Sequence, residues 1–386
     1  MKFILIVDQY FTNRDEYRSG IDFFKKNRQT LFVWDLSKIL QSGSIDIIKN
    51  NAGVFEAKYL KRFSSIRSVT DSIRKLEKNY FFITSIAYTY KTMRIFKEIS
   101  SCGFDYGCHG CYAINLFPDV QNSHLLNNPS KLKKLNQYFQ KLLRVGLKIP
   151  IQFLGIKHSK FFALAGGEKS KAIGPLVGRR TKILKIHASD YDFHLRDENS
   201  NQDIEKDHIV YIDQAIYGAP DMYARGEKFD IDIDKYFSDL RNFFDKIEDE
   251  LKMDVVIASA PKINYSGKEY LFGKRKIVQG FNSRSIIASS SLVLIHYSTA
   301  INFAVIYKKP MMFITSDIIN KYKKPVIDSL SKYFFSKPIN INQNINDLHI
   351  PEVNKNIYKK YFNDYIKGSS SSNKLFWEQV IELINQ

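Results

Sequence analysis

The sequence predicts an α/β fold built on parallel sheets, and two observations support this prediction. Short apolar runs rich in Ile, Leu and Val alternate with amphipathic, Lys-rich segments, which is the pattern of strands joined by helical crossovers. A chain of 386 residues with 44% hydrophobic and 14% aromatic residues can also bury about two separate cores. We therefore expect two globular domains rather than a disordered chain.

The first half of the chain shows this alternation clearly. Its predicted strands are the apolar runs at 3–7, 31–34, 81–83 and 112–117, and the first two end at Asp8 and Asp35. A helix is predicted at 130–146, where Ser130 can cap the start, Gly146 can end the last turn, and an apolar stripe runs opposite Lys and Arg. Its basic face is also suited to an anionic bilayer surface.

The second half repeats the pattern. Its predicted strands lie at 183–186, 209–212, 255–258, 292–295 and 311–314, and its predicted helices at 236–251, 298–307 and 376–384. A Gly- and Lys-rich stretch at 166–178 fits a crossing between domains. We therefore expect an N-terminal domain at 1–175, a C-terminal domain at 176–345, and C-terminal helices at 346–386 that pack back on the domains.

The composition narrows the class of protein. The net charge of +18 is suited to anionic partners, although an A/T-rich genome produces the same excess of Lys, Ile and Asn. Three Cys favour a reducing compartment, the N-terminal apolar run is too short for a signal peptide, and no window of about 18 apolar residues exists. We expect a cytoplasmic protein, with peripheral contact at the inner membrane face. No stripe of aromatic residues interleaved with Lys and Arg indicates nucleic-acid binding.

Polar residues gather at the predicted strand ends of the second half. Open parallel sheets bind ligands at the carboxyl ends of their strands, so residues at those ends are candidates for a binding site. The candidates are His187, Asp190, Asp213, Lys262, His296, Tyr297, Ser298 and Thr299.

The stretch "HYST" at 296–299 is the most specific of these signals. Ser298 and Thr299 come directly after a buried strand and at the expected start of a helix, where free backbone N–H groups and side-chain hydroxyls can bind a phosphate. Ser298 can equally cap the helix without any ligand. Because the other predicted strands of this half also end in polar residues, we favour phosphate binding.

Several blocks within residues 160–317 also resemble a known family. The blocks "TKILKIHASDYDFHLR", "IVYIDQ" and "SLVLIHYSTAINFAVIYKKPMMFITSD" resemble those of bacterial surface-carbohydrate or capsule polysaccharide biosynthesis proteins. More distantly, they are similar to GT-B glycosyltransferases that use CMP-activated acidic sugars, such as sialyltransferases and Kdo transferases. The resemblance is thin before residue 160.

This resemblance implies a GT-B-like fold of two Rossmann-like domains facing a cleft. It further implies a nucleotide-sugar donor held by the C-terminal domain, with a CMP-sugar favoured, a glycan or lipid-linked acceptor held by the N-terminal domain, and no metal or cofactor. Ser298 and Thr299 match the pair that contacts the donor phosphate. Lys262 matches a His-Pro-Lys block whose histidine is replaced here by Ala260, so either Lys262 or His296 substitutes or the protein is a specialised relative.

The implied reaction is attack of an acceptor hydroxyl on the anomeric carbon, with a carboxylate or His as the general base. Asp8, Asp190 and Asp213 are the candidates for this base, and each can instead cap a helix or turn. Two alternatives stay open. One is a catalytically degenerate GT-B-like subunit, which Ala260 favours, and the other is a polyol-phosphate transferase, which would need a histidine at that position.

Two further groups of residues can bind metals but have simpler explanations. Asp230, Asp232 and Asp234 precede a predicted helix, where carboxylates favour the helix dipole and can cap its first turn. Cys102, Cys108 and Cys111 lie near His109, but their spacing lacks a second Cys-x-x-Cys pair. We therefore predict no metal site at either place.

Overall fold

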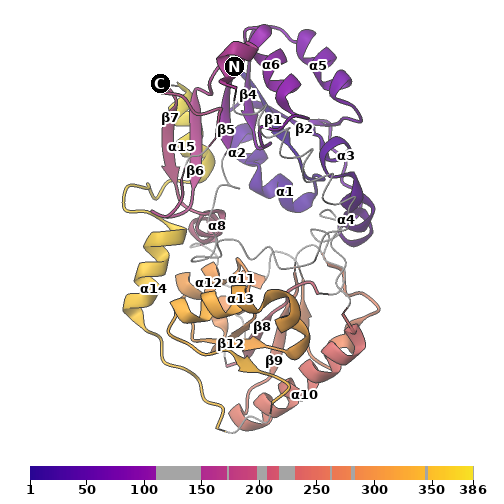
Figure 1. Cartoon of the computed structure of the whole chain (residues 1–386), viewed down its shortest axis with the longest axis vertical. Coiled ribbons are helices and arrows are strands. Elements are labelled where there is room, and N and C mark those ends of the chain that lie inside the picture. The colour runs from indigo at the N-terminus through magenta and orange to yellow at the C-terminus, as the bar shows by residue number, and fades with distance from the viewer. Residues whose placement is uncertain are drawn as a thin grey trace.

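The computed structural model describes residues 1–109, 149–171, 174–197, 207–216, 231–260, 263–279, 283–343 and 347–385. These residues form two lobes, each built around a parallel sheet with helices on its faces (Figure 1). The predicted α/β class with two parallel sheets is confirmed. The predicted strand at 112–117 and helix at 130–146 lie outside the described residues.

The N-terminal lobe contains a seven-stranded sheet in the order β3-β2-β1-β4-β5-β6-β7, all parallel. Its strands are β1 Lys2–Val7, β2 Thr30–Asp35, β3 Leu60–Arg62, β4 Tyr80–Thr84, β5 Asp105–His109, β6 Phe161–Ala165 and β7 Lys182–Ile186. Its helices are α1 Asn13–Arg18, α2 Ile21–Lys26, α3 Ser37–Leu40, α4 Ile45–Ala52, α5 Ile66–Arg74 and α6 Met93–Ser101. The central strands are buried on both faces, as parallel strands between helix layers usually are.

The C-terminal lobe contains a six-stranded parallel sheet in the order β10-β9-β8-β11-β12-β13. Its strands are β8 Ile209–Ile212, β9 Val255–Ala258, β10 Ile277–Val278, β11 Leu292–Ile295, β12 Met311–Thr315 and β13 Ile339–Asn340. Its helices are α10 Ile233–Leu251, α11 Ser283–Ser289, α12 Ile301–Ile306, α13 Asp317–Tyr333 and α14 Lys355–Tyr361, and a π-helical turn, Phe362–Ile366, follows α14.

The last helix, α15 Phe376–Asn385, belongs to the first lobe (Figure 1). Phe376 and Trp377 share a buried cluster with Phe3 and Leu5 of β1, and Trp377 packs against the ring of Phe24. Gly20 has a positive φ of 70°, and a side chain there would collide with the Trp377 indole. The chain therefore completes its N-terminal core with its C-terminal helix.

The boundary predicted at 175/176 needs correction. Strand β7 pairs with β6 from Phe161↔Lys182 to Ala165↔Ile186, so it is the edge of the first sheet and not the first strand of the second. The glycines at 166 and 167 form a connection within the N-terminal lobe, where they pack against the backbone of residues 363–365. The passage between the lobes begins after Ile186.

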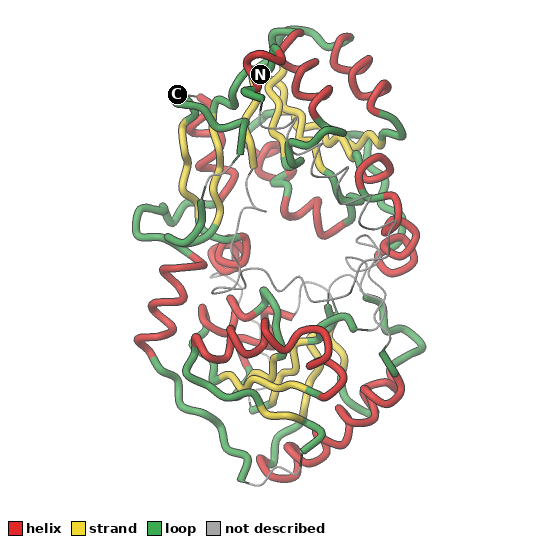
Figure 2. The backbone as a smooth tube through the Cα atoms, in the orientation of Figure 1, coloured by secondary structure: helices red, strands yellow, loops and turns green. Residues whose placement is uncertain are grey.

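Within the described part of the chain, two segments run between the lobes (Figure 2). They are hydrogen-bonded to each other. The outgoing segment contains α8 Ser189–Asp197, and the returning segment links the π-helical turn to α15. The Ala188 N–H donates to the Ile366 carbonyl at 2.7 Å, and the Phe376 N–H donates to Asp192 Oδ1 at 2.6 Å. Helix α8 is thereby fixed at the junction of the two lobes.

Candidate functional site

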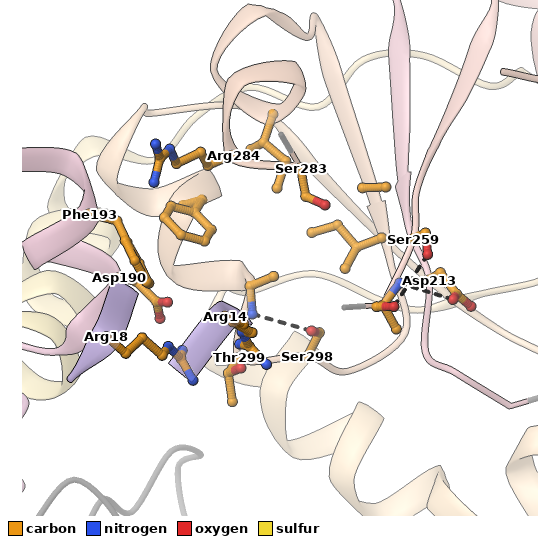
Figure 3. A pocket seen from close by; sticks show the side chains of 16 residues that line it. Arg14, Arg18, Asp190, Phe193, Asp213, Ser259, Ser283, Arg284, Ser298 and Thr299 are labelled. Atoms are coloured by element: carbon orange, nitrogen blue, oxygen red, sulfur yellow. Dashed lines mark hydrogen bonds between the residues drawn. The ribbon is translucent and has the colours of Figure 1, made fainter. Parts of the chain in front are cut away.

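A pocket lies at this junction and is lined by both lobes and by α8 (Figure 3). Its volume is about 150 Å³, whereas pockets that bind a whole cofactor or drug-sized ligand measure about 300–1,000 Å³. The described pocket can therefore hold part of such a ligand. Its lining residues are Arg14 and Arg18 of α1; Asp190 and Phe193 of α8; and, from the C-terminal lobe, Ile212, Asp213, Ala258, Ser259, Ala260, Ser283, Arg284, Ile287, Ser298, Thr299, Ala300 and Phe303. The carboxyl ends of β8, β9 and β11 therefore meet at this pocket, as expected for a parallel sheet.

Asp213 lies at the end of β8 and forms one corner of the pocket. Its Oδ2 accepts hydrogen bonds from the Ala260 N–H at 3.2 Å and the Tyr265 hydroxyl at 2.9 Å, and its Oδ1 accepts from the Ala215 N–H at 3.1 Å. Burial raises the pKa of this carboxyl, and these donors lower it in part. The carboxylate therefore ties the segments after β8 and β9 together.

Ser298 and Thr299 also line the pocket, between β11 and α12. The Ser298 Oγ accepts a hydrogen bond from the Ala300 N–H at 3.2 Å, so this serine supports the turn before the helix. Helix α12 begins at Ile301 rather than at Ser298. Ser298 therefore supports the turn before α12 rather than capping the helix, whose N-cap residue is Ala300, and it lines the pocket.

His296 lies two residues before Ser298 but belongs to the core. Its ring is fully buried, its Nδ1 is 2.6 Å from the Ile314 carbonyl, and its Nε2 is 3.1 Å from the Tyr236 hydroxyl. Burial lowers its pKa to about 4, so the ring is neutral at pH 7. The neutral ring donates from Nδ1 to the carbonyl and accepts from Tyr236 at Nε2. These contacts correct its assignment to the donor site.

His187 and Tyr297 are also placed away from the pocket walls. The His187 ring is fully buried, and its Nε2 donates to the Lys374 carbonyl at 3.0 Å, which joins the two segments between the lobes. Tyr297 is half-buried against the C-terminal core, with Lys323 over its ring at 5.8 Å. His296 and Tyr297 follow the buried strand β11, and His187 follows the edge strand β7. None of the three side chains lines the described pocket.

The three candidate bases have different positions. Asp190 lines the pocket near the start of α8, and its Oδ2 accepts a hydrogen bond from Asn302 Nδ2 at 2.8 Å. Burial raises the pKa of Asp190, while the nearby Arg18 and Arg14 guanidinium groups and the Asn302 amide lower it. Asp8 follows β1 but does not line the described pocket. Lys262 lies outside the described residues.

The arginines of the pocket were not identified from the sequence. Arg14 and Arg18 are four residues apart on α1 and therefore share a face of that helix, and Arg284 lies in the first turn of α11. The Arg18 and Arg284 guanidinium groups each lie 5.6 Å from the centre of the Phe193 ring. The i, i+4 spacing in "RDEYR" was visible, but nothing in the sequence indicated which surface α1 would face.

No group of three or more His, Cys, Asp or Glu side chains is arranged to hold a metal within the described ranges. Cys108 is buried, and the His109 ring stacks on Trp377 at 5.6 Å between centroids. Asp232 caps α10 by accepting from the Lys235 N–H at 2.9 Å. Cys111 and Asp230 lie outside the described residues. None of the helices in the described part of the chain is long and apolar enough to cross a bilayer.

Comparison with known proteins places the fold. No family model matches the sequence, and no curated protein is similar to it in sequence. Among solved structures, the wall teichoic acid polymerase TagF aligns with a TM-score of 0.50 at 12% identity, over 100% of this chain and 88% of that one. UDP-GlcNAc 2-epimerase from Methanocaldococcus jannaschii aligns with 0.47 at 11% identity over 100% of both chains, and MurG from Acinetobacter baumannii with 0.43 at 8% identity over 100% and 95%.

The likeness to TagF, at this identity, concerns the fold. Together with two parallel sheets and a C-terminal helix that returns to the first lobe, it establishes the predicted GT-B-like architecture. The chain is thus an α/β protein of two Rossmann-like domains, here called the N-terminal and C-terminal domains, with a polar pocket between them.

Proposed function

We propose that this protein is a glycosyltransferase that moves a sugar from a nucleotide donor to an acceptor during assembly of a bacterial surface glycan. The observation that carries this proposal is the pocket between the domains, where three guanidinium groups and the hydroxyls of Ser283, Ser298 and Thr299 converge. Guanidinium groups and hydroxyls are the side chains that recognise phosphate oxygens. A CMP-linked acidic sugar is the donor we favour, as the sequence resemblance implies.

The pocket also suggests how the departing phosphate is stabilised without the family histidine. Ala260 takes the place of that histidine in the pocket wall, and the buried His296 cannot approach a ligand without leaving the core. Arg284, which lines the same wall, can supply a permanent positive charge as the bond to the sugar breaks. In this proposal, Lys262 supplies a second positive charge that stabilises the departing phosphate.

Asp190 is the general base that we favour. Its carboxylate lines the pocket, and its raised pKa improves its ability to take a proton from an acceptor hydroxyl. Asp213 is less suited, because three hydrogen bonds from Ala215, Ala260 and Tyr265 already occupy its oxygens. Asp8 stays a candidate only if the acceptor extends beyond the described pocket.

The acceptor in this proposal is a glycan or a lipid-linked precursor bound on the N-terminal side. The net charge of +18 would attract an anionic acceptor and the anionic inner face of the membrane, where the protein would work peripherally from the cytoplasm. A catalytically degenerate subunit that binds nucleotide and supports a partner enzyme is the second candidate. Ala260 favours it, since no histidine lines the described part of the pocket.

The proposal can be tested by a thermal-shift and calorimetry panel with CMP, CDP, UDP and GDP. We expect stabilisation by one nucleotide, because a ligand that binds only the native state raises its stability. The double variant Ser298→Ala plus Thr299→Ala should weaken this binding at least about tenfold. Ser64→Ala, which removes an exposed hydroxyl on the N-terminal domain, is the matched control.

Three results would count against the proposal. A folded wild-type protein that responds to none of the four nucleotides would remove the donor site. Equal nucleotide affinity in the double variant and in Ser64→Ala would leave Ser298 as a structural residue. Binding without any turnover of the matching nucleotide-sugar would favour the degenerate subunit.

A further inference from the structure

The N-terminal domain contributes two cations to a pocket whose phosphate-binding hydroxyls all come from the C-terminal domain. Arg14 and Arg18 lie one helical turn apart on α1, and both line the pocket. The acidic residues of the same helix are engaged elsewhere: Asp15 accepts from the Thr12 N–H at 3.0 Å, and Glu16 accepts from the Tyr59 hydroxyl. Helix α1 therefore presents a cationic face to the pocket and uses its carboxylates locally.

The Arg18 side chain has unused hydrogen-bonding capacity. Its Nε atom is buried and has no hydrogen-bond acceptor within the described residues. A buried donor without an acceptor costs free energy, so such groups are usually satisfied by water, an ion or a ligand. Asp190 is close enough for the Arg18 charge to lower its pKa, but the hydrogen bond to its carboxylate comes from Asn302.

The position of Arg18 is fixed by its surroundings. Its carbonyl accepts a hydrogen bond from the Trp377 Nε1 at 2.7 Å, and its guanidinium lies over the Phe193 ring. The ring of Phe193 in turn stacks on Tyr17 at 5.3 Å with an interplanar angle of 9°. A guanidinium held in this way loses little freedom when it binds a ligand, which favours specific recognition over loose charge attraction.

We infer that Arg18, together with Arg14, binds a second anionic group of the donor, so that the donor carries two negative groups and is held from both domains. This inference rests on the proposed function. The C-terminal wall would hold the phosphate next to the nucleoside, and α1 would hold the second group. Two chemical groups meet this description, the β-phosphate of a nucleoside diphosphate donor and the carboxylate of an acidic sugar in a CMP donor.

The test is isothermal calorimetry of wild type and Arg18→Gln with the monophosphate and diphosphate of the nucleoside that binds. For cytidine the ligands are CMP, CDP and CMP-N-acetylneuraminate. In wild type we expect CDP or CMP-N-acetylneuraminate to bind at least about tenfold more tightly than CMP. Arg18→Gln should remove most of this advantage, because it removes the charge and the fork of donors. The ligand that shows the advantage identifies the second group.

Two further variants make the result specific. Arg14→Gln should reduce the same advantage, and Arg18→Lys should keep part of it, since Lys supplies charge without bidentate geometry. Arg67→Gln, an exposed arginine on α5, should change no affinity. Wild-type protein that binds all three ligands equally, or an advantage retained in Arg18→Gln and Arg14→Gln, would overturn this inference and leave the proposed function intact. Wild type that binds no nucleotide would overturn the proposed function itself.

Discussion

The two walls of the pocket differ in how they are built. The C-terminal wall comes from strand ends and the turns that follow them, as in Asp213 and Ser298, whereas the N-terminal wall comes from the side of the short helix α1. Strand ends are brought together by the sheet itself, so their pattern can be read along the chain. The face of α1 is set by contacts with Trp377 and Phe193, which are far away in sequence. The residues of the C-terminal wall can therefore be predicted from the sequence around each strand. Those of the N-terminal wall depend on contacts that form only in the folded chain.

The largest expected effect concerns the packing of Trp377, which supports helix α1 and therefore the N-terminal wall. Trp377→Ala removes a fully buried indole that packs on Phe24 and His109, and should lower the free energy of unfolding by about 3–5 kcal/mol. Urea unfolding measures this loss when it is followed by far-ultraviolet circular dichroism, a backbone signal that does not rely on the deleted tryptophan. Phe153→Ala, at a side chain that is 83% exposed, is the control. A loss no larger than in the control would mean that α15 does not complete the N-terminal core.

The next prediction compares the two carboxylates of the pocket. Asp190→Asn should reduce turnover of the donor at least about a hundredfold and leave folding intact, because the amide can still accept from Asn302. Asp213→Asn should instead lower the melting temperature, because the NH2 group that replaces one oxygen must face an N–H donor, that of Ala215 or that of Ala260. Steady-state kinetics and thermal unfolding of both variants check this. Unchanged turnover in Asp190→Asn would exclude it as the base.

A further prediction separates the role of His296, which concerns the pH dependence of stability, from that of its neighbour Ser298, which concerns nucleotide binding. The folded-state pKa of His296 is about 4, below its ordinary value of about 6.5, so the unfolded state binds the proton first. The contribution of His296 to the free energy of unfolding is therefore fully present above about pH 6.5 and is lost as the pH falls towards 4. The expected loss between pH 7 and pH 5 is about 2 kcal/mol.

His296→Gln should make the unfolding free energy less dependent on pH by this amount, since Gln can donate to Ile314 and accept from Tyr236 without titrating. Denaturant unfolding at pH 7, 6 and 5 measures the difference. Nucleotide affinity at pH 7 should not change, in contrast to the double variant at Ser298 and Thr299. A loss of affinity in His296→Gln equal to that of the double variant would return this histidine to the donor site.

The smallest effect concerns a residue outside both walls. Asp232→Ala removes the side-chain cap of α10 and should cost about 1 kcal/mol of stability, a typical value for an N-cap. Addition of Mg²⁺ or Mn²⁺ should stabilise the wild type and the variant equally, as shown by melting temperatures. A metal-dependent stabilisation that disappears in Asp232→Ala would revive a metal role for the acidic stretch near α10.

The sequence predicted most of the sheets but only part of the site, for physical reasons. Apolar runs identified β1, β8, β9, β11 and β12, since a buried parallel strand leaves a continuous signal. The same signal could not assign β7 to a sheet, because pairing depends on neighbours rather than on the strand's own residues. Among the polar residues predicted at strand ends, Asp190, Asp213, Ser298 and Thr299 line one pocket, whereas the side chains of His187 and His296 turn into the core.

The return of α15 to the N-terminal domain has a consequence for the synthesis of the chain. Domains usually fold in order as they leave the ribosome. Here Phe376 and Trp377 of α15 fill a cluster that contains Phe3 and Leu5 of β1, so this core stays incomplete until α15 has emerged. The C-terminal domain can bury its own clusters before that moment. We therefore expect the domain that is translated second to become stable first, and nascent chains stalled before residue 376 to need protection by chaperones.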